Sequence, residues 1–263
     1  MKRVGLLLMV AAVFAVQGCK SKEPAKDAPV AEVAKPSVPQ ATPLDPATLG
    51  DVSGTIHFTG KPPVAVKIDT SMDPACGMSG GGDFSAEQYV VKDGKLANVY
   101  VYVKSGPAAA MSAGPVSTAP VVLDQKGCRY TPHVIAVMKG SSVSFQNSDV
   151  TMHNIHTMPT VVGNEAIDVS QGPKGAPVLK QFNDPEVMMP VRCNNHPWMN
   201  AFINVSATSF FAVTDEAGHF EIKGLPAGTY TLAVVHEKMG EQTMTVTVAA
   251  KDSSTADFTY SMK

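Results

Sequence analysis

Short runs of alternating apolar and polar residues recur through the chain from residue 50 onward. The run 52–58 alternates strictly and ends at Gly60-Lys61-Pro62-Pro63, a composition typical of a turn. Similar strand-like runs lie at 99–103, 134–138, 142–145, 202–205, 220–222, 229–235 and 244–248. No stretch beyond residue 50 keeps a helical period, so the pattern predicts an all-β chain built from one or two β-sandwiches.

The first 48 residues have a different pattern. A basic start precedes an apolar run, 4–16, that is too short to span a bilayer and ends at Gln17-Gly18-Cys19. These residues resemble a bacterial lipobox, which predicts a signal peptide at 1–18 and lipidation of Cys19. By the sorting rules of bacterial lipoproteins, Lys20 and Ser21 in place of Asp favour an exported lipoprotein on the periplasmic side of the outer membrane or on the cell surface. A plain signal peptide with a chance cysteine is the alternative.

A proline-rich tether is expected at 19–48. Residues 20–48 contain six prolines, no glycine and no aromatic residue. Such a composition cannot bury a core, so this segment should stay extended and lift a folded domain away from the membrane.

Composition narrows the class of protein. The chain has 263 residues, and 44% of them are hydrophobic, which is enough for one large or two small domains. The formal net charge of -2 lacks the basic excess of a nucleic-acid-binding protein.

The segment Cys193-Asn194-Asn195-His196-Pro197-Trp198-Met199 offers a thiolate, an imidazole and a thioether within one tight loop. With a second imidazole from elsewhere, these groups form the His2Cys set with a weak axial Met that is typical of blue copper sites. Zinc is a rival for a Cys/His cluster, but it seldom binds a thioether and usually takes more cysteines.

Further motifs lie upstream of this loop: Cys128-Arg129-Tyr130-Thr131-Pro132, Lys139-Gly140, Val143-Ser144-Phe145 and His153-Asn154-Ile155-His156. Together with His196-Pro197-Trp198-Met199 in the loop, they resemble the cupredoxin family, and within it the amicyanins and the plastocyanin-like domains. It implies a cupredoxin Greek-key β-sandwich at 119–206 that binds one type 1 copper ion.

Carried over position by position, the resemblance implies four copper ligands: His153, Cys193, His196 and Met199. It also implies supporting roles for Asn154, which would brace the cysteine loop, and for Pro197 and Trp198. In this family electrons pass through an exposed edge of the second histidine. The edge of His196 is therefore expected to form a small apolar docking patch for an unidentified redox protein.

Three details stay open at this level. His156 lies three residues from His153, so in a strand it should face away from a metal bound there, and a surface or supporting role is favoured. The long segment between His156 and Val191 is expected to form a loop that covers or borders the copper site. Scattered methionines allow a Cu(I) store, although packing is the favoured interpretation because they form no M-x-x-M runs.

The C-terminal part resembles the carboxypeptidase regulatory-like, or transthyretin-like, sandwich through 212–220 and 224–230. The opening strand typical of such a module lies far upstream, at 52–56. Residues 49–118 and 207–263 therefore form either one sandwich with 119–206 inserted, which is favoured slightly, or two sandwiches in tandem.

Two of the four cysteines, Cys76 and Cys128, have no place in the predicted lipid anchor or copper site. In an oxidising compartment the simplest interpretation is a disulfide between them. A second metal site with His133 is the alternative, without recognisable spacing.

Together these patterns predict a monomeric copper protein that carries single electrons and is not an enzyme. A copper chaperone or buffer, and a structural surface lipoprotein, are the alternatives.

Overall fold

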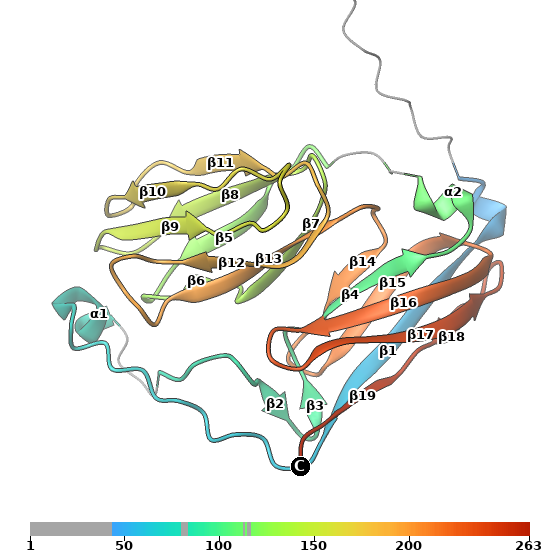
Figure 1. Ribbon diagram of the computed structural model, residues 1–263, viewed down its shortest axis with the longest axis horizontal. Helices are drawn as coiled ribbons and strands as arrows, with labels where there is room; N and C mark the ends of the chain where they lie inside the picture. The colour runs from blue at the N-terminus through green and yellow to red at the C-terminus, as the bar shows by residue number, and fades with distance from the viewer. Residues whose placement is uncertain (1–43, 80–83, 113, 115–116) are drawn as a thin grey trace, which may run out of the picture. The chain divides into compact units, whose positions relative to one another are not determined.

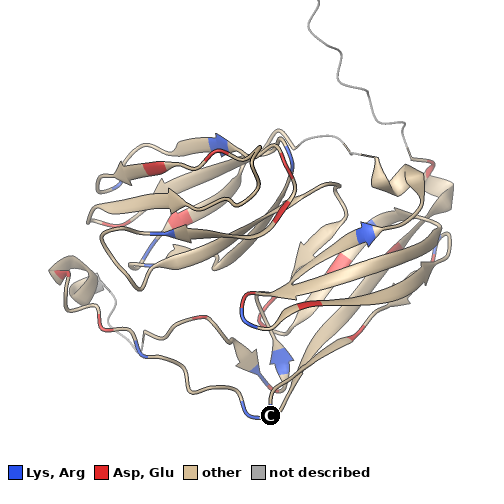
Figure 2. Cartoon of the chain, in the orientation of Figure 1, with Lys and Arg blue, Asp and Glu red and all other residues tan. Residues whose placement is uncertain are grey.

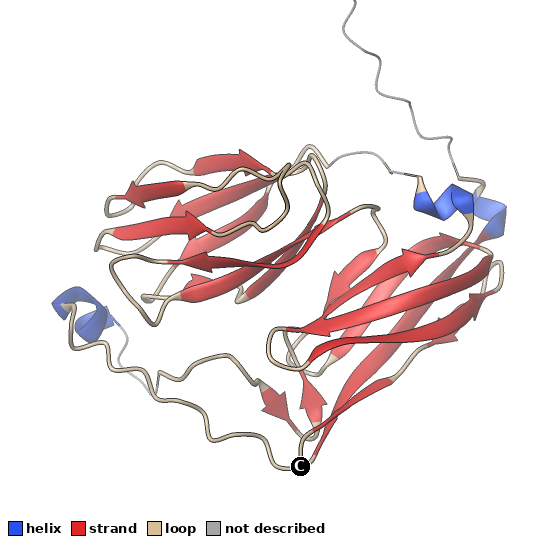
Figure 3. Ribbon diagram, in the orientation of Figure 1, coloured by secondary structure: helices blue, strands red, loops and turns tan. Residues whose placement is uncertain are grey.

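The computed structural model describes residues 44–79, 84–112, 114 and 117–263, and β-strands are the dominant regular structure in this part (Figures 1 and 3). The prediction of an all-β chain is confirmed. Three short helical segments interrupt the strands: η1 (Pro46–Thr48), α1 (Pro74–Ser79) and α2 (Ala108–Met111). None of the helices in the described ranges is long and apolar enough to cross a membrane.

One sandwich is built from both ends of the described chain. Its first sheet contains β1 (Leu49–Thr59), β2 (Val91–Lys92), β3 (Lys95–Leu96), β15 (His219–Pro226), β18 (Ser253–Thr255) and β19 (Phe258–Ser261). Its second sheet contains β4 (Tyr100–Ser105), β14 (Phe211–Val213), β16 (Gly228–His236) and β17 (Gly240–Val248). Val52 of β1 pairs with Ile222 of β15, and both pack in one core with Val101 and Leu232 of the second sheet.

The alternation of β1 places Val52 and Ile56 in this core, while Gly54 between them has a different role. A Cβ on Gly54 would lie 2.1 Å from the backbone oxygen of Ala256. Glycine is therefore needed because β1 runs between β15 on one side and β18 and β19 on the other.

A second sandwich lies between β4 and β14 in the sequence, so the two sandwiches are nested. One sheet has the order β10 (Asp168–Gln171), β9 (His153–Thr157), β12 (Glu186–Arg192), β13 (Asn200–Ser206) and β7 (Val134–Met138). The other has the order β11 (Val178–Gln181), β8 (Ser142–Asn147), β5 (Val121–Gln125) and β6 (Tyr130–Thr131). Leu123 and Phe145 from one sheet pack against Ile155 and Ile203 from the other.

The segment between His156 and Val191, expected as a loop that covers or borders the copper site, contains two strands and borders the predicted ligand His153, which pairs with Gln171. It contributes β10, which pairs with β9, and β11, which pairs with β8. The extra chain therefore widens both sheets by one edge strand.

The signal peptide, Cys19 and the tether up to residue 43 lie outside the described residues. The end of the predicted tether is ordered as η1, whose first turn is capped by the Asp45 carboxylate. Charged residues of both signs are spread over the strands and loops of both sandwiches (Figure 2). This distribution matches the near balance of 21 basic and 23 acidic residues in the whole sequence.

Candidate metal centre

The predicted ligands meet at one end of the β9–β12–β13 sheet. His153 is the first residue of β9, and Cys193 follows the last residue of β12. Arg192 of β12 pairs with His156 on one side and Asn200 on the other, so β12 holds β9 and β13 in register. The loop between β12 and β13 therefore returns beside the start of β9.

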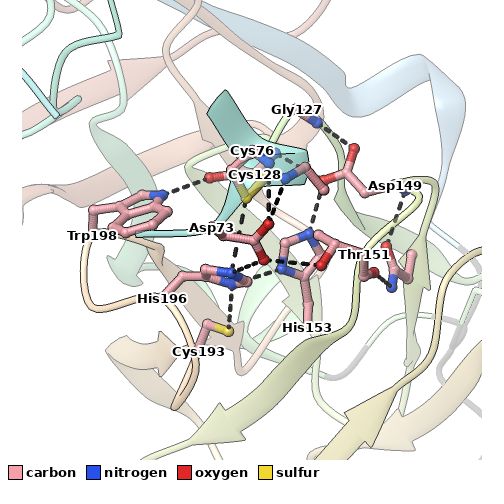
Figure 4. The surroundings of a disulfide bond; sticks show 12 residues. Asp73, Cys76, Gly127, Cys128, Asp149, Thr151, His153, Cys193, His196 and Trp198 are labelled. Atoms are coloured by element: carbon pink, nitrogen blue, oxygen red, sulfur yellow. Dashed lines mark hydrogen bonds and ion pairs between the residues drawn. A yellow bond between two sulfur atoms is a disulfide. The ribbon is translucent and has the colours of Figure 1, made fainter. Parts of the chain in front are cut away.

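Two imidazole nitrogens and one sulfur atom converge there (Figure 4). The Nδ1 atoms of His153 and His196 are 2.9 Å apart, and the Sγ atom of Cys193 lies 3.5 Å from His196 Nδ1. All three donors lie within 4.8 Å of one another. The three side chains are buried, with 0%, 5% and 3% exposure for His153, Cys193 and His196. The sequence spacing thus corresponds to a compact cluster in space.

Met199 closes the ligand loop. Its backbone N–H donates to the His196 carbonyl at 2.9 Å, and its carbonyl accepts from the Cys193 N–H at 3.3 Å. The side chain is buried and belongs to the same apolar cluster as Cys193. The backbone of the fourth predicted ligand is therefore bonded to both ligands of its own loop, Cys193 and His196.

The thiol of Cys193 is held in a polar setting within the core. Burial would raise its pKa, but hydrogen bonds from His153, from the backbone N–H groups of Asn154 and Asn195 and from His196 lower the pKa to about 7. The Asn154 N–H lies 3.3 Å from Sγ. A thiolate, the form that binds metals, is thus accessible near neutral pH.

The side chain of Asn154 contacts the cysteine loop. Its side-chain oxygen accepts from the Asn194 N–H at 3.3 Å, and its amide donates to Asp168 at 2.8 Å. The Tyr130 hydroxyl also donates to the Asn154 carbonyl. The bond with Asn194 ties β9 to the loop that carries the thiol, and the other two bonds hold Asn154 itself in place.

Trp198 packs beside the second histidine, while Pro197 between them is exposed. The Trp198 ring centroid lies 5.1 Å from that of His196, and its Nε1–H donates to the Cys128 carbonyl at 3.0 Å. His156 points elsewhere, with Nδ1 3.0 Å from the Asn194 side-chain oxygen. It is absent from the donor cluster, as the period of a strand predicts.

Two carboxylates that sequence reasoning missed bind the outer nitrogens of the histidines. Asp149 Oδ2 lies 2.8 Å from His153 Nε2, and Asp73 Oδ2 lies 3.0 Å from His196 Nε2. Carboxylates in such positions orient a ligand imidazole and raise its basicity. Asp149 stands four residues before His153, a local signal that was available. For Asp73, the one signal in the sequence was its position three residues before Cys76.

Electrostatics keep both carboxylates charged. The hydrogen bond with His196 lowers the pKa of Asp73 to about 2. Burial would raise the pKa of Asp149, but hydrogen bonds from His153 and from the N–H groups of Cys128 and Gly127 lower it. For His153, burial would lower the pKa, but Asp149 and Cys193 raise it to about 9.

Cys76 and Cys128 form a disulfide, with their Cα atoms 5.6 Å apart. Their sulfur atoms are therefore not free to bind a metal, although each lies in a group of possible ligands near the histidines. His133, the third member of the alternative metal site, instead contacts Glu237 at 2.7 Å and the Asn200 carbonyl at 3.2 Å.

The expected exposed edge of His196 is wrong. The ring is 3% exposed, because Asp73 and Cys76 cover its Nε2 side; the Cys76 Sγ atom lies 3.8 Å away. We name residues 69–79, which include α1, the cover segment. It lies between β1 and β2 in sequence, and both of these strands belong to the sandwich that does not hold the predicted ligands. Motif spacing within 119–206 could not reveal it.

The donor set fits copper. Both Nε2 atoms are engaged by carboxylates, so the two Nδ1 atoms point toward each other and toward the thiol, where a metal would be held. Two imidazoles, one thiolate and the thioether of the same loop form the set that accommodates both Cu(I) and Cu(II). Zinc sites usually take a closed tetrahedral set with more cysteines.

Comparison with known proteins gives a family match for the C-terminal part. Residues 192–261 match the carboxypeptidase regulatory-like domain. This confirms the likeness predicted from 212–220 and 224–230, and the match begins upstream of the expected boundary at 207. No curated protein sequence matches the chain.

Among solved structures, amicyanin from Paracoccus versutus is 24% identical, with a TM-score of 0.30. The match covers 40% of this chain and 97% of that one. A copper-containing nitrite reductase from Thermus scotoductus SA-01 is 24% identical, with a TM-score of 0.31. That match covers 36% of this chain and only 24% of the reductase, about a quarter of its length.

Proposed function

We propose that this protein binds one copper ion at His153, Cys193, His196 and Met199 and carries single electrons between redox partners. The observation that carries the proposal is the convergence of two Nδ1 atoms and one Sγ atom in a buried cluster. When bound, copper supplies a one-electron couple between Cu(I) and Cu(II).

The residues of the chain provide a site that rearranges little. The carboxylates of Asp149 and Asp73 accept hydrogen bonds from the two Nε2 atoms and so fix both rings, and the Asn154 N–H donates to the thiolate. Burial of the cluster excludes bulk water, so few solvent dipoles need to reorient when the charge of the site changes. No second cluster of imidazoles with His-x-His spacing is present in the sequence, so we propose an electron carrier rather than an enzyme.

Redox cycling of the copper-loaded full chain tests this function. The blue absorption band should disappear on one-electron reduction and return fully on oxidation by a small inorganic oxidant, through several cycles. The variant Cys193→Ser, prepared and loaded in the same way, is the matched control. Release of copper to a Cu(I) chelator on each reduction would contradict the electron-carrier proposal and support copper handling instead.

The proposal extends to a lipid anchor at Cys19, which would place the copper domain at a membrane surface outside the cytoplasm. Expression of the full chain in a Gram-negative host should yield a membrane-associated protein. The variant Cys19→Ala should move to the soluble fraction or keep its uncut signal. An unchanged distribution with a cut signal in both proteins would contradict lipidation.

A further inference from the structure

The two carboxylates at the histidines are each tied to one half of the disulfide (Figure 4). Asp73 Oδ1 accepts from the Cys76 N–H at 3.3 Å while its Oδ2 faces His196. Asp149 Oδ2 accepts from the Cys128 N–H at 2.8 Å and also faces His153. The disulfide therefore connects two carboxylate–histidine pairs, one on each side of the donor cluster.

The two pairs differ in how they are held. Asp149 belongs to the loop between β8 and β9, where Asn147 accepts the Asp149 N–H at 3.0 Å and Gly127 donates to Asp149 Oδ1 at 2.7 Å. Asp73 comes from the cover segment, outside the copper-site sandwich. Its contacts with that sandwich are the bonds with His196 and with the Thr151 hydroxyl, which donates at 2.9 Å.

The covalent link is thus the strongest connection between the cover segment and the site. Cys76 and Cys128 are 52 positions apart, and both are buried, with 0% and 1% exposure. Without the disulfide, Asp73 would have to be kept in place by two side-chain hydrogen bonds, each of which competes with water.

We propose that Asp73 is a positioning residue of the copper centre, that the Cys76–Cys128 disulfide delivers it to His196, and that its charge favours Cu(II) over Cu(I). The inference rests on the proposed function. A fixed negative charge stabilises the doubly charged ion more than the singly charged one, and the effect is large where solvent is largely excluded. The side chain of Asp73 is 21% exposed, so screening by water is only partial.

The reduction potential of the copper-loaded full chain tests the role of Asp73. Asp73→Asn keeps the size and an oxygen acceptor for the Ala75 and Cys76 N–H groups but removes the charge. We expect the Cu(II)/Cu(I) equilibrium to shift toward Cu(I) about tenfold, which corresponds to about 59 mV for one electron. Asp73→Ala should shift it in the same direction, which keeps the test valid if one variant folds poorly.

Asp69→Asn is the matched control. Asp69 is an exposed carboxylate of the same cover segment, and its side chain accepts from the Ser71 N–H at 2.9 Å. Its removal should change the equilibrium by less than about twofold, because a solvated charge is screened. Equal potentials for the Asp73→Asn and Asp69→Asn variants would overturn the assignment of Asp73.

A double-mutant cycle tests the role of the disulfide. Asp73→Asn is measured again in a chain with both Cys76→Ser and Cys128→Ser. If the disulfide delivers Asp73, the effect of the substitution should fall below about threefold in this background. An undiminished tenfold effect would overturn delivery by the disulfide. Absence of the blue band from the wild-type protein would instead refute the proposed function, so the two failures are distinguishable.

Discussion

His236 should make the folded state sensitive to mild acid. This residue ends β16, and its ring is 1% exposed, with centroids 5.6 Å from the Tyr89 ring and 6.1 Å from the Tyr260 ring. Its Nδ1 accepts from the Lys238 N–H at 3.3 Å, whereas its Nε2 has no hydrogen-bond partner among the described residues. Burial lowers the pKa of His236 from 6.5 to about 4, with the carboxylate of Glu237 opposing the shift.

The sign and size of the change in stability with pH follow from proton linkage at His236. Between pH 6.5 and about 4 the unfolded chain binds a proton at His236 and the folded chain does not, so stability rises with pH in this window. The contribution is fully present above pH 6.5 and is lost as the pH falls toward 4. At 1.36 kcal/mol per pH unit, the loss amounts to roughly 3 kcal/mol.

Urea unfolding of the metal-free protein at pH 7, 6, 5 and 4 measures this loss. Other groups titrate in the same range, so the test is the difference between the wild type and His236→Phe, which keeps an aromatic ring in the core. That difference should change by roughly 3 kcal/mol in favour of the variant between pH 7 and 4. His219→Gln removes an exposed imidazole from the same sandwich and serves as the control. A difference between wild type and His236→Phe that is constant with pH would refute the reasoning.

Three further predictions concern stability and the copper centre. Removal of the disulfide by Cys76→Ser with Cys128→Ser should lower the free energy of unfolding by about 4 kcal/mol, because the bond closes a loop with a sequence separation of 52. Urea unfolding measures the loss, and a loss below about 1 kcal/mol would contradict the prediction. Gly54→Ala should cost about 1–3 kcal/mol through its clash with backbone, while Gly172→Ala, with nothing within 4 Å of the new Cβ, is the control in thermal unfolding. Equal melting temperatures would refute the clash. Met199→Leu should keep the intense blue band and raise the reduction potential by roughly 60 mV, since a weak axial donor to Cu(II) is lost; a lower potential in voltammetry would exclude Met199 as that donor.

Several strands of both sandwiches were predictable because their patterns are local. Strict alternation at 52–58 corresponds to β1, and the run at 134–138 corresponds to β7. The ligand loop was predictable because Cys193, His196 and Met199 lie in one short loop, 193–199, and their spacing in sequence limits how far apart they can lie.

The rest depended on contacts between distant parts of the chain. β10 consists mostly of exposed residues, and it becomes a strand because β9 offers a free edge. The cover over His196 depends on Asp73, more than 120 residues away in sequence, and no period or motif links the two. The resemblance was itself misleading here, because it implied an exposed histidine edge that the cover segment buries.

The visible absorption spectrum of the full chain titrated with Cu(II) tests the central claim most directly. One equivalent of copper should produce an intense thiolate-to-copper band at roughly 600 nm, and Cys193→Ser should abolish it. The variant Asp69→Asn, prepared in parallel, should keep the band. A colourless protein, or a weak band that survives in Cys193→Ser, would contradict a copper centre built on His153, Cys193 and His196.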